Sequence, residues 1–194
     1  AFYLSLPIVY IAIKEQKIKY LLKNSWWTII PVIALFAWNH YSKTTNELAP
    51  DWDFIPNYNK FTEMWYWYFG TLFQRTLPEL WVNIGVRILN EISGYIGLII
   101  ATIGLLFYNK NKSFYFGLSW LIGSVLYLII FFNLNVVHNY YQIPFLVPIA
   151  IFIAFGIGAI TNIKWPSKKL STLVAAILIL FIVGESYLYA EQNY

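Results

Sequence analysis

HNYYQIPFLVPIAIFIAFGIGAI, residues 138–160, begins with a histidine and two tyrosines and continues as an apolar run. From residue 141 onward the run has no charged side chain, and as a helix it is long enough to cross the hydrocarbon core of a bilayer, about 30 Å. Backbone in lipid must satisfy its own polar groups, which a segment this apolar does as an α-helix. The stretch therefore predicts a membrane span with polar aromatic groups at its mouth.

The composition extends this interpretation to the whole chain. Hydrophobic residues make up 59% and charged residues only 11%, which leaves too few polar groups to coat a soluble globule. We expect an all-α fold, a polytopic transmembrane helical bundle of about six spans with the first one truncated. The expected spans are 1–13, 26–41, 94–108, 114–132, 141–160 and 170–189.

The chain has the features of one membrane domain, 1–194, taken from a longer protein. It begins without methionine, inside an apolar stretch of 13 residues that is too short for a span. We expect 42–93 to form an outer interfacial loop region and 94–189 to form a C-terminal four-span bundle. Because there is no cysteine, disulfides and thiolate metal sites are excluded.

The distribution of basic residues predicts the topology. The loops after the first, third and fifth expected spans contain Lys14, Lys17, Lys19, Lys23, Lys110, Lys112, Lys164, Lys168 and Lys169. Short cytoplasmic loops carry such an excess, so we expect these loops inside a cell membrane and the long loop and the C-terminus outside. Topology thus explains the net charge of +4, and no nucleic-acid partner is expected.

The long outer connection contains two amphipathic patterns. Residues 61–74 place aromatic and apolar side chains at helical spacing, and residues 80–92 align their polar residues on one face. Tryptophan and tyrosine are common at the depth of lipid headgroups. We expect two in-plane amphipathic helices that cover the outer end of the bundle.

One motif resembles a known family. His138, Tyr140 and Tyr141, then Pro144, Pro148 and a glycine-containing apolar helix, look like the C-terminal half of bacterial GT-C-fold glycosyltransferases. That family is similar to the dolichyl-phosphate-mannose protein mannosyltransferases and the aminoarabinose transferases of lipid A. The resemblance implies a polyprenyl-phosphate-linked sugar as donor and a lipid, protein or glycan as acceptor on the outer face.

The resemblance also implies an essential acid in the first outer loop, which is expected upstream of Ala1. No catalytic residue is therefore assigned, and we expect this piece alone to be inactive. The alternative function is a non-catalytic part of a multi-span transporter or flippase that handles lipid-linked glycans. The sequence assigns neither the sugar, the acceptor nor an oligomeric state.

The donor phosphate needs cations and hydroxyl donors at headgroup depth. The candidate phosphate-binding residues are His138, Tyr140, Tyr141, Arg75 and Arg87, and the weaker candidates are Asp51, Asp53 and Lys60. Membrane lipids are the other expected partners. No cofactor or metal site is assigned, although a divalent metal stays open because carboxylates such as those of Asp51 and Asp53 can be ligands.

Each candidate also has a purely structural interpretation. Tyr140 and Tyr141 could be interfacial anchors, as tyrosines at helix mouths often are. Arg87 could pair with Glu91 one helical turn later. Arg75 could extend its side chain to lipid phosphate. His138 could hydrogen-bond to a loop carbonyl, and the two aspartates could be solvated in a proline-flanked turn.

Overall fold

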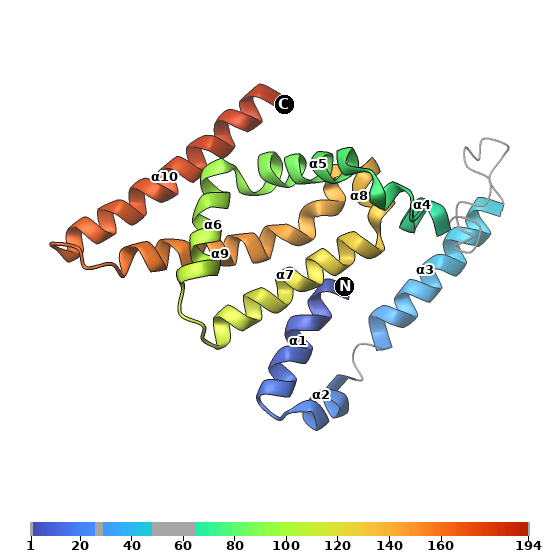
Figure 1. Ribbon diagram of the computed structural model, residues 1–194. Coiled ribbons are helices and arrows are strands. Elements are labelled where there is room, and N and C mark those ends of the chain that lie inside the picture. The colour runs from blue at the N-terminus through green and yellow to red at the C-terminus, as the bar shows by residue number, and fades with distance from the viewer. Residues whose placement is uncertain (1, 26–28, 48–64, 194) are drawn as a thin grey trace.

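The computed structural model describes residues 2–25, 29–47 and 65–193, and all regular structure in these ranges is helical (Figure 1). In chain order the elements are α1 (Phe2–Lys14), α2 (Ile18–Asn24), α3 (Ile29–Glu47), α4 (Trp65–Phe69), the 3-10 helix η2 (Gln74–Thr76), α5 (Pro78–Arg87), the π-helix η3 (Ile88–Ser93), α6 (Tyr95–Phe107), α7 (Lys112–Ile130), α8 (Phe132–Val137), the 3-10 helix η4 (Asn139–Phe145), α9 (Leu146–Thr161) and α10 (Lys168–Asn193). The predicted all-α class is confirmed.

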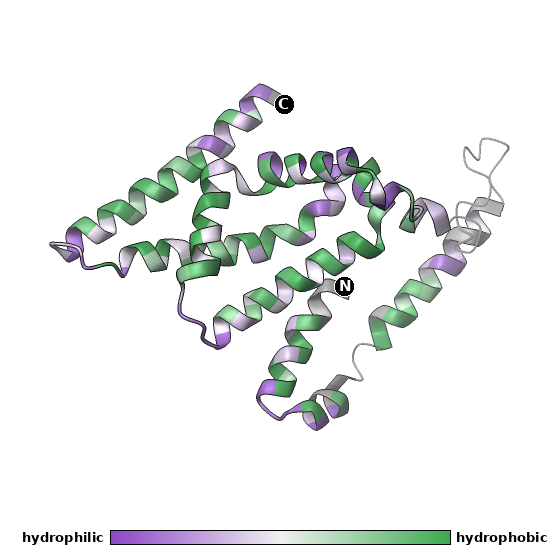
Figure 2. Ribbon diagram, in the orientation of Figure 1, coloured by the Kyte–Doolittle hydropathy of each residue, from purple (hydrophilic) through white to green (hydrophobic). Residues whose placement is uncertain are grey.

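Three helices in the described ranges are long and apolar enough to cross a membrane: Lys112–Ile130, Asn139–Thr161 and Lys168–Gln192. They coincide within a few residues with the last three expected spans, and Figure 2 shows that they are hydrophobic along most of their length. The segments Pro78–Ser93 and Tyr95–Phe107 meet at a bend of 92°. If the two are counted together as one broken span, the number of candidate spans is four. The structure thus supports three or four spans and does not confirm six.

The other expected spans are shorter or more polar than a membrane helix requires. Helices α1 and α6 have 13 residues each, about 20 Å at 1.5 Å per residue, against a hydrocarbon core of about 30 Å. Helix α3 has 19 residues but ends in the polar run NHYSKTTNE. These helices occupy the residue ranges of the first three expected spans, but none of them alone is long and apolar enough for a membrane span.

The two amphipathic patterns have different outcomes. The first is not confirmed as a helix over 61–74, because residues 61–64 lie outside the described ranges and α4 ends at Phe69. Gly70 follows with φ of 71°, a left-handed conformation that an α-helix does not continue through. The second pattern, 80–92, is helical throughout as α5 and η3. Whether it lies in the plane of a membrane stays a prediction.

Helices α6 and α9 cross in the centre of the molecule, where two glycines bring their backbones together (Figure 1). A Cβ atom added to Gly104 would collide with the carbonyl oxygen of Phe152. One added to Gly156 would collide with the carbonyl oxygen of Ile100. Small residues permit such close approach between helices in membranes, where no hydrophobic effect drives apolar helices together. Gly104 and Gly156 therefore allow α6 and α9 to pack backbone against backbone.

The N-terminus of α6 is capped by a side chain from α10. Gly94 precedes the helix with φ of 64° and has no side chain to offer as a cap. Instead, the Glu185 carboxylate accepts hydrogen bonds from the backbone N–H groups of Tyr95, at 2.6 Å, and Ile96, at 3.0 Å. The first N–H groups of a helix lack intrahelical partners and favour negative charge. This contact explains an acid within an otherwise apolar helix.

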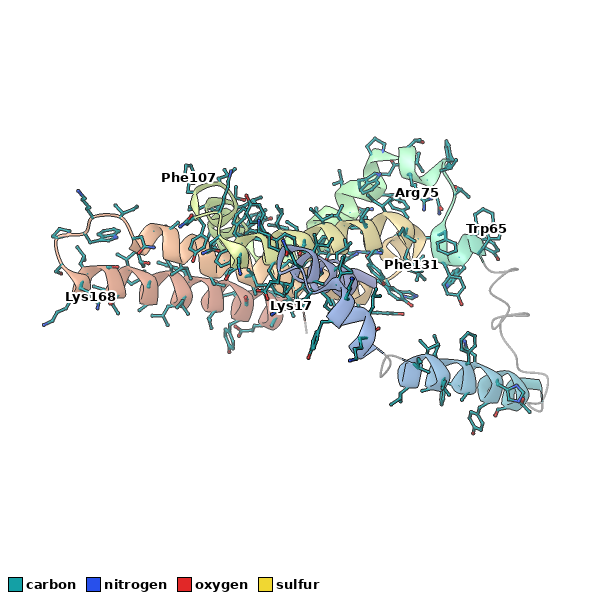
Figure 3. The ribbon with its side chains drawn as sticks, turned by 90° about the horizontal axis from the view of Figure 1, so that it is seen from below. Lys17, Trp65, Arg75, Phe107, Phe131 and Lys168 are labelled. Atoms are coloured by element: carbon teal, nitrogen blue, oxygen red, sulfur yellow. The ribbon has the colours of Figure 1, made fainter. Side chains whose placement is uncertain are left out.

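The two ends of α7 differ in chemistry. At its first residue, the Nζ atom of Lys112 lies 3.3 Å from the carboxylate of Glu15, in the turn that follows α1. At its other end α7 leads into α8 and the histidine-tyrosine segment. Figure 3 shows Arg75 and Phe131 near one end of the molecule and Phe107 and Lys168 toward the other. Charged loops and polar aromatic groups therefore occupy opposite ends of this helix.

The α6–α9 crossing predicts a clear difference between two glycine-to-alanine variants. We expect Gly156→Ala to lower the free energy of unfolding by about 1–3 kcal/mol, because the added methyl group forces the helices apart. Gly184→Ala is the matched control, since an added Cβ there has no atom within 4 Å in the described part of the chain. It should be neutral or stabilise by up to about 1 kcal/mol. Thermal unfolding followed by circular dichroism measures both, and equal midpoints for the two variants would contradict the close contact.

Candidate functional site

The connection between α7 and α9 is a folded segment with a polar interior. Asn133, Asn135 and Gln142 are all buried in it, with exposed fractions of 8%, 0% and 1%. Buried polar groups are costly unless they are hydrogen-bonded, so their contacts determine how this segment is held.

Asn133 joins the connection to the chain around α4. Its Nδ2 atom donates to the carbonyl oxygen of Trp67 at 2.8 Å, and its Oδ1 atom accepts from Nε2 of Gln74 at 3.1 Å. Within the connection, Gln142 Nε2 donates to the carbonyl oxygen of Asn135 at 2.9 Å. The polar side chains thus link segments that are far apart in the sequence.

His138, Tyr140 and Tyr141 form one aromatic cluster at the start of η4. The ring centroids of His138 and Tyr140 are 5.0 Å apart, those of His138 and Tyr141 are 6.0 Å apart, and those of the two tyrosines are 4.5 Å apart. Tyr140 is 53% exposed. In the described ranges no side-chain hydrogen bond is formed by the His138 ring or the Tyr140 hydroxyl, so the loop-carbonyl interpretation of His138 has no support there.

Arg87 lies directly against this cluster's segment. Its Nη1 atom donates to two consecutive carbonyl oxygens, those of Asn135 at 3.3 Å and Val136 at 2.9 Å. Both belong to α8, whose last carbonyls have no intrahelical partner. Nη2 and Nε of Arg87 have no partner within the part of the chain that the structure describes. One edge of the guanidinium therefore holds the segment and the other remains available.

Glu91 contacts the same segment and does not pair with Arg87. Its Oε2 atom accepts a hydrogen bond from Nδ2 of Asn139 at 2.9 Å. The suggested Arg87–Glu91 ion pair is absent among the described residues. The pair is absent because the π-helix η3 starts at Ile88 and widens the turn. Positions four apart therefore no longer lie one above the other.

Arg75 is engaged differently from Arg87. Nη1 donates to the carbonyl oxygen of Thr71 at 2.9 Å, and Nη2 donates to those of Phe69 at 2.6 Å and Ile129 at 3.1 Å. The guanidinium carbon also lies 5.3 Å from the ring centroid of Phe132. Both terminal nitrogens are thus occupied by backbone oxygens, one of them from the last turn of α7. These contacts indicate a structural clamp, and a phosphate-binding role for Arg75 stays a prediction.

The weaker candidates Asp51, Asp53 and Lys60 lie outside the described residues. Over 2–25, 29–47 and 65–193, no group of three or more His, Asp or Glu side chains is close enough to hold a metal ion. The structure gathers His138, Tyr140 and Tyr141 into one cluster and holds Arg87 against the backbone of α8 that precedes them. Glu91 contacts Asn139 in the same segment. A phosphate-binding role for these residues stays a prediction.

Sequence reasoning missed the polar residues that support this site. Asn133 and Asn135 appear in the sequence as FNLNVV, where two amides alternate with apolar residues before the histidine. Amides in a segment bordered by two spans are a signal for buried hydrogen bonds, since lipid offers them no partner. Ser124 gives a similar signal inside α7, and its hydroxyl donates to the carbonyl oxygen of Pro144 at 2.8 Å.

No protein-family model, curated protein or solved structure matches this chain. The fold itself defines the class that is supported, an α-helical protein with three or four helices suited to a membrane. Within that class, the described site consists of two parts. One is Arg87, of which only Nη1 is hydrogen-bonded, to the backbone of α8. The other is the cluster of His138, Tyr140 and Tyr141, which follows α8 in the chain.

The clamp formed by Arg75 predicts the effect of a charge-conserving substitution. Arg75→Lys keeps the positive charge but cannot donate to three carbonyls from a planar fork. We expect the free energy of unfolding to fall by about 2 kcal/mol, because one ammonium group cannot reach all the carbonyls that the two terminal guanidinium nitrogens bind. Thermal unfolding in detergent measures this loss, and an unchanged midpoint would show that Arg75 does not hold the fold.

Proposed function

We propose that this chain is part of a membrane glycosyltransferase that transfers a sugar from a polyprenyl-phosphate-linked donor to a lipid, protein or glycan acceptor. The support comes from the resemblance of the His138 motif to GT-C-fold enzymes and from the apolar helices. The single observation that carries the proposal is the position of Arg87, whose Nη1 is bound to the carbonyls of Asn135 and Val136, three and two residues before His138. A cation and a polar aromatic cluster are thereby brought together.

Arg87 is the residue best suited to bind the donor phosphate. Guanidinium groups recognise phosphate through two parallel N–H donors, and its Nε and Nη2 form such an edge. The contacts of Nη1 fix the side chain, so little conformational entropy remains to be lost when phosphate binds. Arg75 has no comparable free edge, because both of its terminal nitrogens are occupied.

His138 and Tyr140 would complete the phosphate site. A tyrosine hydroxyl donates one hydrogen bond, and a histidine donates one or two according to its protonation state. Ring stacking at 5.0 Å holds the two side chains in one orientation. A half-buried histidine beside an exposed tyrosine suits a headgroup that reaches the site from the lipid side.

In the proposed reaction, the acceptor hydroxyl oxygen attacks the anomeric carbon while the bond from that carbon to the phosphate oxygen breaks. The bonding electrons leave with the phosphate, and the hydroxyl proton passes to a base that no described residue is assigned to provide. Negative charge on the phosphate increases as the bond breaks. Fixed donors such as Arg87 bind the transition state more strongly than the ground state, which is the source of catalysis.

The proposed topology keeps the six spans and places 42–93 on the outer face with in-plane amphipathic helices. The 92° bend between Pro78–Ser93 and Tyr95–Phe107 supports this arrangement, since a helix that turns sharply from a span can follow the membrane surface. The contact between Lys112 and Glu15 brings two basic loops together, as expected for loops on one side. We assign those loops to the cytoplasm of a multi-pass protein in the cell membrane.

Activity is tested with membranes that contain the intact protein and a short-chain polyprenyl-phosphate sugar. We expect Arg87→Gln and His138→Ala to lower kcat, the arginine variant by about 100-fold, because a donor to the leaving phosphate is lost. Asn83→Ala, an exposed change one turn earlier in α5, is the matched control and should retain activity. Unchanged rates in both site variants would refute the site. Donor binding without transfer by the wild-type protein would favour the transporter or flippase alternative.

Sidedness can be tested by cysteine labelling, because the chain has no cysteine of its own. We expect a membrane-impermeant maleimide added outside intact cells to label Asn83→Cys and Asn139→Cys. Lys110→Cys should be labelled only after the membrane is permeabilised. If residues 83 and 139 react from opposite sides, Arg87 and His138 cannot belong to one site, and the transferase proposal fails.

A further inference from the structure

A cavity lies at the beginning of α7, between α1 and α7. Its volume is about 310 Å³, at the lower limit of ordinary ligand pockets. Tyr10, Ile11 and Phe116 form apolar walls, while Lys14 and Lys112 stand at the rim. The cavity therefore combines an apolar interior with ammonium groups at one edge.

Positive charge exceeds negative charge at this rim. The Glu15 carboxylate accepts from Lys17 at 2.8 Å and from Lys112 at 3.3 Å. These two neighbours hold the pKa of Glu15 below its usual value, so the carboxylate stays ionised at neutral pH. Lys14 has no ion-pair or hydrogen-bond partner within the described ranges. Among the residues that line the cavity, Lys14 and Lys112 thus stand against the single carboxylate of Glu15.

We propose that this cavity binds an anionic phospholipid of the surrounding membrane. The lipid phosphate lies between the ammonium groups of Lys14 and Lys112, and the start of one acyl chain packs against Ile11 and Phe116. Basic pockets between membrane helices on the cytoplasmic side commonly recognise anionic headgroups. The apolar walls distinguish a lipid from a free phosphate ion, which would leave them exposed to water.

The inference does not depend on the proposed transferase activity. The cavity is at the beginning of α7, whereas Arg87 and His138 are near α8, beyond the other end of the same helix (Figure 1). Lipid binding is measured with no sugar donor present, so failure of one proposal leaves the other intact.

The test is native mass spectrometry of the whole chain in detergent, titrated with phosphatidylglycerol or with phosphatidylcholine. We expect the wild type to retain phosphatidylglycerol more strongly. Lys14→Gln should weaken its affinity for phosphatidylglycerol about fivefold and leave phosphatidylcholine binding unchanged, because one lysine near the surface is lost. Since Lys14 has no partner among the described residues, the fold should be unaffected, and circular dichroism checks this.

Lys110→Gln is the matched control. It removes a lysine from the loop next to Lys112 that does not line the cavity, and should have no effect on either lipid. Ile11→Trp fills the cavity and should weaken both lipids without changing charge. Equal binding of the two lipids by the wild type, or an equal loss in Lys14→Gln and Lys110→Gln, would overturn the proposal. Displacement of the lipid by millimolar glycerol phosphate would also overturn it, since the headgroup alone would then explain binding.

Discussion

The structure depends on hydrogen bonds from side chains to backbone carbonyls where helices end between the apolar spans. Between α7 and α9 the chain leaves the α-helix at Phe131 and again over 138–145, so carbonyls at the ends of α7 and α8 lack intrahelical partners. Arg75 satisfies oxygens at the end of α7, and Arg87 satisfies oxygens at the end of α8. The two arginines thereby tie the connection to α5 and to the chain around α4.

The same requirement positions the candidate site. Arg87 reaches the carbonyls of α8 because α5 lies beside that segment, and this contact fixes the guanidinium on the helix that leads into His138. Glu91 holds Asn139 from the π-helical turn that follows. One edge of the Arg87 guanidinium thus holds the fold, and the other edge has no partner among the described residues. Both terminal nitrogens of Arg75 are bound to backbone oxygens, so its described contacts hold the fold.

The sequence predicts what depends on local pattern and misses what depends on distant partners. Long apolar runs identify three helices suited to a membrane, and polar spacing identifies the helix over 80–92, since both signals are contained in neighbouring residues. The aromatic pattern over 61–74 does not reveal that Gly70 ends α4. The side-chain hydrogen bond between Gln74 and Asn133 joins residues 59 positions apart, so the spacing of neighbouring residues cannot predict it. Arg75 and Arg87 look alike in sequence for the same reason.

The cap that Glu185 provides to α6 has a consequence for biogenesis. The carboxylate and the N–H group of Tyr95 are 90 positions apart, so α6 leaves the ribosome long before its cap is made. Until α10 has been synthesised and inserted, the first turn of α6 must find other acceptors, such as interfacial water or lipid phosphate. Docking of α10 therefore completes the first turn of α6, and it does so only once translation has passed residue 185.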